Sequence, residues 1–390
     1  MATDTEHPTD AVEAKGNPLH ELHTLGQSVW LDYIRRGILA NGELKEMIRS
    51  YDLRGITSNP SIFEQAMGDS DDYDDALTAL AAKGTQGSAA YEALAVEDIR
   101  AACDLFREVY DKAQGADGFV SLEVSPELAH DTAGTLEEAR RLWKAVDRPN
   151  LMIKVPGTDA GIPAIEQLIA DGFNVNVTLL FSVASHEKVM EAYLRGLEKR
   201  HAAGQPLERV ASVASFFVSR VDSAIDGQLE KIAEKESGKR DRVLALRGKA
   251  AIANAKLAYA RFREVFSGER WERLRAAGAL VQRPLWASTS TKNPDYRDVI
   301  YVEELIGRDT VNTMPLATVE AFGDHGVARA TVDQDVDGAR ADLAALAEAG
   351  IDLDAVTDQL QREGVDKFTQ SFREMIESVG GKLSRVAQSA

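Results

Sequence analysis

The stretch NLMIKVPGTD, Asn150–Asp159, places a lysine inside an apolar run that has the length of a strand. Side chains alternate along a strand, so Leu151, Ile153 and Val155 share one face and Lys154 lies on the other. A buried ammonium group is unfavourable unless it is paired. One interpretation is an edge strand whose lysine tip reaches water. The other is a strand of a closed barrel whose lysine points inward.

Eight short runs of this kind alternate along the chain with longer segments of helical periodicity. Strand–helix alternation repeated eight times is typical of a closed parallel barrel ringed by helices, the (β/α)8 or TIM barrel. The alternative is an open, doubly wound α/β sheet. The expected strands are residues 28–32, 54–59, 118–124, 150–155, 173–180, 209–215, 280–288 and 308–314.

We expect a single barrel domain over residues 18–380, because an α/β barrel accommodates this many residues. Residues 1–17 lack the basic start and apolar run of a signal peptide, so we expect a disordered leader there. Residues 381–390 are expected to form a flexible tail. Helices beyond one per strand are expected in three intervals of the chain, near 65–115, 216–278 and 327–364.

The composition limits the classes of partner. The chain of 390 residues has a net charge of −18 and a pI near 4.9, so its surface repels nucleic acids and anionic membranes. We therefore expect neither as a partner, and no apolar run is long enough to span a bilayer. A single cysteine, Cys103, excludes a disulfide within the chain and suits a cytoplasmic protein. The oligomeric state stays open between a monomer and a homodimer.

Polar side chains lie on the second face of several expected strands, toward the C-terminal ends. Asp32, Glu123, Lys154 and Thr178 belong to the first, third, fourth and fifth of them. In a barrel these faces point inward, and these ends surround the mouth at which active sites form. A hydrogen-bonded polar plug is the alternative, but several ionisable groups together are more typical of an active site.

A lysine in a largely apolar pocket indicates covalent catalysis through a Schiff base. The amine must be neutral to attack a carbonyl group, and burial favours the neutral form. Glu123 and Asp32 would then exchange protons with the substrate. The chain lacks the common nucleotide-binding, nucleophile-elbow and zinc-protease motifs, and its seven histidines are scattered. We therefore expect no cofactor and no metal.

Six stretches in a fixed order carry a family resemblance. They are GITSNPSIF (55–63), VSLEVSPELAHDT (120–132), NLMIKVPGTDAGI (150–162), NVNVTLLFS (174–182), VASFFVSRVD (213–222) and STSTKNP (288–294). Together they resemble the transaldolase family, in its longer bacterial subgroup, over almost the whole span from Ser28 to about His325. The resemblance implies a cofactor-free enzyme that moves a dihydroxyacetone unit between sugar phosphates in the non-oxidative pentose phosphate pathway.

The resemblance also implies catalytic roles. Lys154 matches the lysine that forms the Schiff base with the ketone. Asp32 matches the aspartate that handles the hydroxyl proton during carbon–carbon cleavage. Glu123 matches a glutamate that acts through a water molecule, and Thr178 matches the threonine that holds this water.

Substrate-binding residues follow from the same motifs. Asn59 and Asn176 match asparagines that bind hydroxyls of the three-carbon unit, and Thr57 lines the same region. Ser215 and Arg220 fall where the family holds the substrate phosphate, although Arg220 could instead be a helix-surface charge paired with Asp222 or Asp226. Shorter transaldolases have a serine and an arginine near the seventh strand. Here Ser288 matches the serine, which leaves the second cation open between Lys292 and none.

Two alternatives to a transaldolase remain at this point. A related fructose-6-phosphate aldolase releases dihydroxyacetone, and that group tends to have tyrosine and glutamine where this chain has Phe217 and Glu123. A homologue without catalytic activity would bind sugar phosphates only. The presence of Lys154, Asp32 and Glu123 argues against it.

Overall fold

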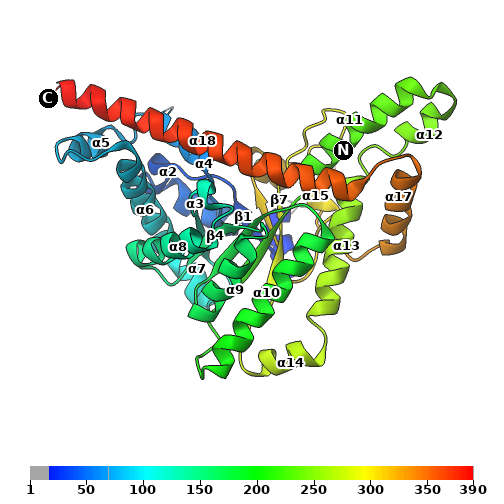
Figure 1. Ribbon diagram of the computed structural model, residues 1–390, viewed down its shortest axis with the longest axis horizontal. Helices are drawn as coiled ribbons and strands as arrows, with labels where there is room; N and C mark the ends of the chain where they lie inside the picture. Colours follow the sequence, from blue (N-terminus) through cyan, green and yellow to red (C-terminus); the bar gives the residue numbers. More distant parts are fainter. Residues whose placement is uncertain (1–16, 69, 390) are drawn as a thin grey trace, which may run out of the picture.

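The eight predicted strands form a closed parallel barrel. The computed structural model describes residues 17–68 and 70–389, and its strands pair in chain order from β1 to β8, with β8 returning to β1. Helices surround the barrel (Figure 1). The predicted (β/α)8 fold is therefore confirmed. The strands are Gln27–Leu31 (β1), Leu53–Ile56 (β2), Phe119–Glu123 (β3), Leu151–Pro156 (β4), Val175–Leu180 (β5), Ser212–Phe217 (β6), Gln282–Ala287 (β7) and Thr310–Met314 (β8).

Helices exceed one per strand in the three intervals where the sequence predicts extra ones. The first interval holds α5 to α7, the second α11 to α14, and the third α17 and the start of α18. The α-helices are Pro18–Thr24 (α1), Arg36–Ala40 (α2), Glu43–Ser50 (α3), Pro60–Gly68 (α4), Asp74–Ala81 (α5), Gly87–Leu105 (α6), Arg107–Lys112 (α7), Thr132–Val146 (α8), Gly161–Asp171 (α9), Val183–Ala202 (α10), Ser219–Lys235 (α11), Arg240–Leu244 (α12), Ala250–Val265 (α13), Glu269–Ala276 (α14), Ile300–Glu303 (α15), Leu316–His325 (α16), Val336–Glu348 (α17) and Leu353–Ser389 (α18).

The second strand is shorter than predicted, because its last residues start a helix. β2 ends at Ile56 instead of residue 59. Ser58 donates a hydrogen bond to the carbonyl of Ser121 at 2.7 Å, and Asn59 Oδ1 accepts one from the first turn of α4 at 3.0 Å. Side chains of this type compete with ladder hydrogen bonds and favour helix starts. The polar residues after Ile56 are thereby held at the mouth of the barrel.

The C-terminal segment differs from the sequence prediction. Residues 381–390 were expected to form a flexible tail, but α18 continues as helix through Ser389. Leu383 is buried in this segment, and Lys382 donates hydrogen bonds to the carbonyls of Met67 and Ser70 at 2.7 and 3.0 Å. Most of the predicted leader, residues 1–16, lies outside the described residues. The rest of it, Asn17, caps α1.

α18 is one helix of 37 residues, which corresponds to a length of about 55 Å. It crosses the face of the barrel at which the strands end and packs on α4, α5, α6 and the end of β5 (Figure 1). Apolar side chains that recur at helical spacing are buried beneath it. They are Val356, Leu360, Val365, Phe368, Met375, Val379 and Leu383.

The register of three neighbouring strands determines which polar groups meet inside the barrel. Glu123 of β3 lies beside Lys154 of β4, and Lys154 lies beside Asn176 of β5. Because side chains alternate along each strand, Thr178 points inward two residues beyond Asn176. A shift of one residue would turn these groups to the helix-covered face. The barrel therefore brings the predicted groups together at its C-terminal end.

The opposite end of the barrel is closed by a polar network around Asp117. Trp30 Nε1 donates to Asp117 Oδ1 at 3.0 Å, and Ser28 donates to its other oxygen. Arg283 lies 3.3 Å from Asp117 and also donates to Ser28 at 2.7 Å. The side chains of Arg283 and Asp117 are only 15% and 7% exposed. This network joins β1 and β7 to the segment just before β3 at the bottom of the barrel, where TIM barrels carry residues for stability.

A buried histidine lies between α10 and β6. His186 is fully buried, its ring packs 5.9 Å from that of Phe216, and neither ring nitrogen has a hydrogen-bond partner in the described part of the chain. Burial disfavours the charged ring and lowers the pKa of His186 to about 4. The folded protein therefore holds this side chain neutral over the physiological range.

Within the described ranges, none of the helices combines the length and the hydrophobicity that a membrane crossing requires.

Replacing Asp117 with alanine should lower the free energy of unfolding by about 3 kcal/mol, because it leaves Arg283 buried without a counter-charge. Urea denaturation measures this loss. The matched control is Asp358→Ala on the exposed face of α18, which should change stability by no more than about 0.5 kcal/mol. Equal stability of the two variants would contradict the role assigned to the network.

His186 should make stability depend on pH between about 6.5 and 4. The unfolded histidine binds a proton in this window and the folded one does not, so stability falls as the pH falls, by up to about 1.4 kcal/mol per pH unit. A His186→Phe variant lacks this contribution. Its free energy of unfolding, measured by urea titration at several pH values, should fall less steeply than that of the natural protein. Parallel curves would show that the ring does not titrate in this way.

Candidate active site

The mouth of the barrel contains a cavity of about 330 Å³, here called the mouth pocket. It lies at the C-terminal ends of the strands, and α18 forms one of its walls. Ten of the twelve predicted site residues line it. The lining residues are Asp32, Thr57, Asn59, Ser61, Ile62, Gln65, Lys154, Thr178, Ser215, Phe217, Arg220, Ala287, Ser288, Ser290, Lys292, Thr313, Pro315, Lys367 and Phe368.

Lys154 reaches the mouth pocket from β4 with a side chain that is only 5% exposed. Its Nζ atom lies 3.1 Å from Glu123 Oε2 and donates a hydrogen bond to the carbonyl of Ser58 at 2.9 Å. The ring of Phe368 covers it at 5.7 Å. The sequence analysis expects a buried amine that is kept neutral close to acidic side chains, and the structure places this amine beside the carboxylate of Glu123. Transfer of one proton to Glu123 gives the neutral nucleophile.

Glu123 and Thr178 present buried oxygen atoms without protein partners. Apart from the ion pair with Lys154, neither oxygen of Glu123 has a hydrogen-bond partner among the described residues, and the Thr178 hydroxyl has none. Burial raises the pKa of Glu123, while the positive charge of Lys154 opposes this shift. Buried polar groups are rarely left unpaired, and such groups suit a bound water or a substrate hydroxyl.

Asp32 lies at the end of β1 on the opposite side of the pocket. Thr57 donates a hydrogen bond to Asp32 Oδ1 at 2.6 Å, and its hydroxyl is also 2.6 Å from that of Thr313. Burial raises the pKa of Asp32, and the charge of Lys154 opposes that shift. A carboxyl group with a raised pKa and a fixed orientation is suited to accepting and returning a proton. The two threonines set that orientation.

The two asparagines differ in position. Asn59 lines the mouth pocket and uses Oδ1 to cap α4. Asn176 is fully buried and does not line the pocket, because its amide donates to Ser121 at 3.0 Å and its oxygen accepts from Ser215 at 2.7 Å. Asn176 thus orients Ser215, which does line the pocket.

Three basic side chains besides Lys154 line the mouth pocket: Arg220, Lys292 and Lys367. The guanidinium carbon of Arg220 lies 5.1 Å from the centre of the Phe217 ring. Burial lowers the pKa of Arg220, with the charge of Asp32 opposing the shift. Lys292 lies on the loop after β7 and donates to Ser290 at 2.6 Å. Lys292 therefore lines the pocket, and its role toward the phosphate stays a prediction.

Neither aspartate in the alternative interpretation of Arg220 contacts it. Asp222 accepts hydrogen bonds from Tyr301 and from the backbone of α13, each at 2.8 Å. Asp226 accepts one from Tyr296 at 2.6 Å. Arg220 is therefore not a surface charge neutralised by its own helix.

Ser288 closes the basic side of the pocket in an unusual backbone conformation. Its φ angle is +56°, which side chains other than glycine rarely adopt. Its hydroxyl lies 3.0 Å from that of Ser219, and its carbonyl accepts from the Ser219 amide at 3.0 Å. Such local strain is concentrated at functional sites, and Ser288 lines the same pocket as the basic side chains.

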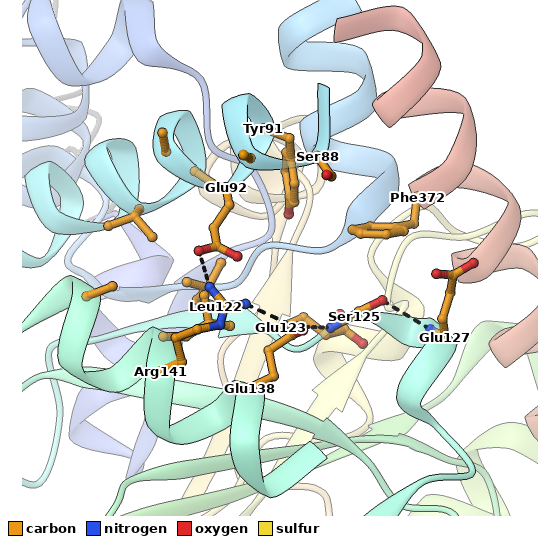
Figure 2. Close-up of a pocket in the computed structure, with 16 residues that line it drawn as sticks. Ser88, Tyr91, Glu92, Leu122, Glu123, Ser125, Glu127, Glu138, Arg141 and Phe372 are labelled. Carbon is orange, nitrogen blue, oxygen red and sulfur yellow. Dashed lines mark hydrogen bonds and ion pairs between the residues drawn. The ribbon is translucent and has the colours of Figure 1, made fainter. Parts of the chain in front are cut away.

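Behind Glu123 lies a second cavity of about 620 Å³, between α6, α8 and α18 (Figure 2). Tyr91 projects into it with its hydroxyl end foremost, and Arg141 pairs with Glu92 across it. Four glutamates and a single arginine line this cavity, whereas four basic residues and one aspartate line the mouth pocket. An anionic substrate is therefore attracted to the mouth pocket, although it is the smaller of the two.

Several pocket residues carry no signal in the sequence. Phe368 fits the apolar stripe of α18, so the sequence pattern predicts a core residue. In the structure its ring covers Lys154. Lys367 and Gln65 sit on helices whose position over the mouth depends on long-range packing. Thr313 on β8 could have been found, because it lies on the inward face of its strand and within one residue of its end.

In the part of the chain that the structure describes, no three His, Cys, Asp or Glu side chains form a group that could hold a metal ion.

Comparison with known proteins agrees with this geometry. A family model described as transaldolase/fructose-6-phosphate aldolase matches residues 29–379. The chain belongs to this family. A transaldolase of Parafrankia sp. (strain EAN1pec) is 50% identical to it over 371 residues, which are 95% of this chain and 99% of the relative. A transaldolase of Mycolicibacterium smegmatis is 50% identical over 369 residues, which are 94% of this chain and 98% of the relative.

A third relative gives the same result. The transaldolase of Thermobifida fusca is 49% identical over 370 residues, which are 95% of this chain and 99% of the relative. The similarity to the family therefore extends from the first strand through most of α18, and includes every residue that lines the mouth pocket.

A Thr178→Val substitution should separate function from stability. Because the hydroxyl has no hydrogen-bond partner in the described part of the chain, its removal should leave the free energy of unfolding unchanged or raise it by about 1 kcal/mol. The transaldolase turnover number should fall by about 100-fold, within the range typical of lost proton-transfer assistance. Urea denaturation and steady-state kinetics measure the two effects.

The matched control for that substitution is Thr135→Val on α8. The Thr135 hydroxyl is buried and donates to the carbonyl of Leu128 at 3.1 Å. Its loss should cost about 1 kcal/mol of stability and leave activity unchanged. If Thr178→Val lost stability like the control and kept its activity, Thr178 would be a structural residue.

Proposed function

We propose that this protein is a transaldolase that transfers a dihydroxyacetone unit from sedoheptulose 7-phosphate to glyceraldehyde 3-phosphate, giving erythrose 4-phosphate and fructose 6-phosphate. The observation that carries the proposal is the Lys154 amine inside the barrel, 3.1 Å from Glu123, in a pocket that also contains Asp32 and three cations. Family membership and the relatives named transaldolase support it. The reaction belongs to the non-oxidative pentose phosphate pathway.

The first step is attack of the Lys154 amine on the ketone of the donor sugar. Glu123 takes a proton from the ammonium group, so the neutral amine adds to the carbonyl carbon and gives a carbinolamine. The ion pair at 3.1 Å supports direct transfer between these two groups. The unpaired hydroxyl of Thr178 and the carboxyl of Glu123 then hold a water through which the carbinolamine loses hydroxide as water, leaving the iminium ion.

The second step is cleavage of the carbon–carbon bond that joins the carbon next to the iminium carbon to the hydroxyl-bearing carbon that follows it. Asp32 removes the proton of that hydroxyl, its electron pair forms the aldehyde carbonyl, and the electrons of the broken bond move into the iminium group. The aldose phosphate leaves and an enamine of dihydroxyacetone stays on Lys154. A second aldose phosphate then accepts this unit by the reverse steps. Thr57 keeps Asp32 in place at 2.6 Å.

Substrate binding uses two regions of the mouth pocket. We assign Asn59 to a hydroxyl of the three-carbon unit near Lys154. Asn176 acts on the same unit indirectly, by orienting the pocket residue Ser215. Arg220 and Lys292 are assigned to the phosphate, together with Ser288. Arg220 offers a planar pair of donors and Lys292 a point charge, both of which suit a phosphate group.

A fructose-6-phosphate aldolase remains the second candidate, since the family model covers both activities. Phe217 has no hydroxyl to help release the three-carbon unit, and Glu123 is a carboxylic acid where the aldolases tend to have an amide. Both residues favour transfer. With fructose 6-phosphate as donor, the products should include little free dihydroxyacetone until an acceptor aldose phosphate is added, and then the new ketose phosphate. Steady release of dihydroxyacetone without acceptor would favour the aldolase.

We further propose that the enzyme works in the cytoplasm, as a monomer or a homodimer, and needs neither cofactor nor metal. The single buried thiol and the acidic surface support the compartment. The iminium ion serves as the electron sink of the reaction, so the proposed chemistry is complete with side chains alone.

Treatment with borohydride in the presence of fructose 6-phosphate should trap the Schiff base as a stable adduct on Lys154, which mass spectrometry locates. Lys154→Met should form no adduct and lose activity by about 10⁴-fold or more. The matched control is Lys256→Met, since Lys256 is also largely buried and lies 3.4 Å from Glu304. This variant should keep the adduct on Lys154. An adduct elsewhere, or activity in Lys154→Met, would refute the assignment.

A further inference from the structure

α18 brings a lysine to the mouth pocket that belongs to none of the barrel strands or their loops. Lys367 lines the pocket, and its neighbour Phe368 covers Lys154. In Figure 1 the helix runs across the barrel as one continuous rod, far along the chain from the strands that it covers. The residues that it contributes are therefore positioned by packing of the helix and not by the strand–loop plan.

The part of α18 around Lys367 is fixed on the barrel from both sides. Gln361 donates hydrogen bonds to the carbonyls of Gly157 and Leu179, at 3.2 and 3.1 Å. One turn before Lys367, Gly364 lies so close to Leu179 that an added Cβ would be 2.9 Å from its side chain. One turn after it, Ser371 accepts a hydrogen bond from Ser61 at 2.8 Å. These contacts fix the backbone from which the Lys367 side chain extends.

Lys367 makes no ion pair with any residue that the structure describes. The carboxylate best placed to neutralise it is Glu363, one helical turn earlier. Glu363 instead accepts a hydrogen bond from Gln359 at 2.6 Å. Lys367 therefore carries a free ammonium group, in contrast to the many lysines and arginines of this chain that are paired on the surface.

The positive charge of Lys367 adds to that of two other cations that have no carboxylate partner among the described residues. No carboxylate among the described residues lies within ion-pair distance of Arg220, Lys292 or Lys367. Burial lowers the pKa of Lys292, and the nearby charges of Arg220 and Lys367 lower it further. Three cations that repel one another, in a protein with a net charge of −18, form a local site for an anion.

We propose that Lys367 is a substrate-specificity residue that binds the phosphate monoester of the sugar substrates and so completes a three-sided phosphate site. Arg220 comes from α11, Lys292 from the loop after β7 and Lys367 from α18, so the three side chains approach from different elements. A monoester dianion has three oxygens that can each accept from a different cation. The identity of the sugar in this inference rests on the proposed transaldolase function. The assignment of a phosphate rests only on the positions of the three cations.

The site is expected to discriminate against neutral sugars. A rim lysine contributes through a charge-assisted hydrogen bond to phosphate, and contributes nothing when the phosphate is missing. Lys367 has no contact with Lys154, Glu123 or Asp32 among those that the described residues make, so its effect should appear in substrate binding and not in the chemical step.

The test is a comparison of Lys367→Met with Arg362→Met in the full-length enzyme. Arg362 is exposed on the same helix and does not line the pocket. With glyceraldehyde 3-phosphate as acceptor, Lys367→Met should raise KM by about tenfold and change kcat by less than about twofold. With unphosphorylated glyceraldehyde as acceptor, its kcat/KM should equal that of the natural enzyme. Lys367→Arg should restore most of the lost affinity, and Arg362→Met should match the natural enzyme throughout.

Calorimetric titration with inorganic phosphate gives a readout that does not depend on catalysis. Lys367→Met should weaken phosphate binding by about tenfold relative to Arg362→Met. Equal phosphate affinity and equal KM values in the two variants would overturn the inference, while a borohydride adduct on Lys154 would leave the transaldolase function standing. If no adduct formed on Lys154, the proposed function would fail, and the phosphate titration would still decide the role of Lys367.

Discussion

The ion pair between Lys154 and Glu123 is the contact on which the rest of the site depends. It forms because β3 and β4 pair in a register that sets the two residues side by side inside the barrel. A buried lysine alone would be strongly unfavourable, and a buried carboxylate alone equally so. Together they form a pair whose proton can move between them, so the same contact keeps the fold intact and supplies the nucleophile and its base.

The two ends of the barrel differ in how their buried polar groups are hydrogen-bonded. At the bottom, Asp117, Ser28, Trp30 and Arg283 satisfy one another through direct hydrogen bonds. At the mouth, the Thr178 hydroxyl has no hydrogen-bond partner among the described residues, and Glu123 has only its ion pair with Lys154. Unpaired buried groups reduce stability. The groups at the mouth therefore lower the stability of the fold, but they are available to bind substrate. A polar plug and an active site thus occupy the same barrel, at different ends.

The sequence predicts the barrel and most of the site because both depend on local alternation. Apolar residues on one face of each strand and Asp32, Lys154 or Thr178 on the other are visible in short stretches, and the strand ends identify the mouth. Asn176 shows the limit of this reasoning: its strand face is inward as expected, but neighbouring serines occupy its amide. Phe368 and Lys367 were missed because only tertiary packing shows that α18 lies over the mouth.

α18 also has a consequence for how the enzyme is made. It follows all eight strands in the chain, yet it supplies two residues of the pocket wall and covers the reactive amine. A nascent polypeptide emerges from the ribosome with its N-terminal part first. The barrel strands are therefore available for pairing before the helix that closes their mouth has been synthesised. Catalytic competence is consequently acquired late, when this last helix docks, and not when the barrel closes.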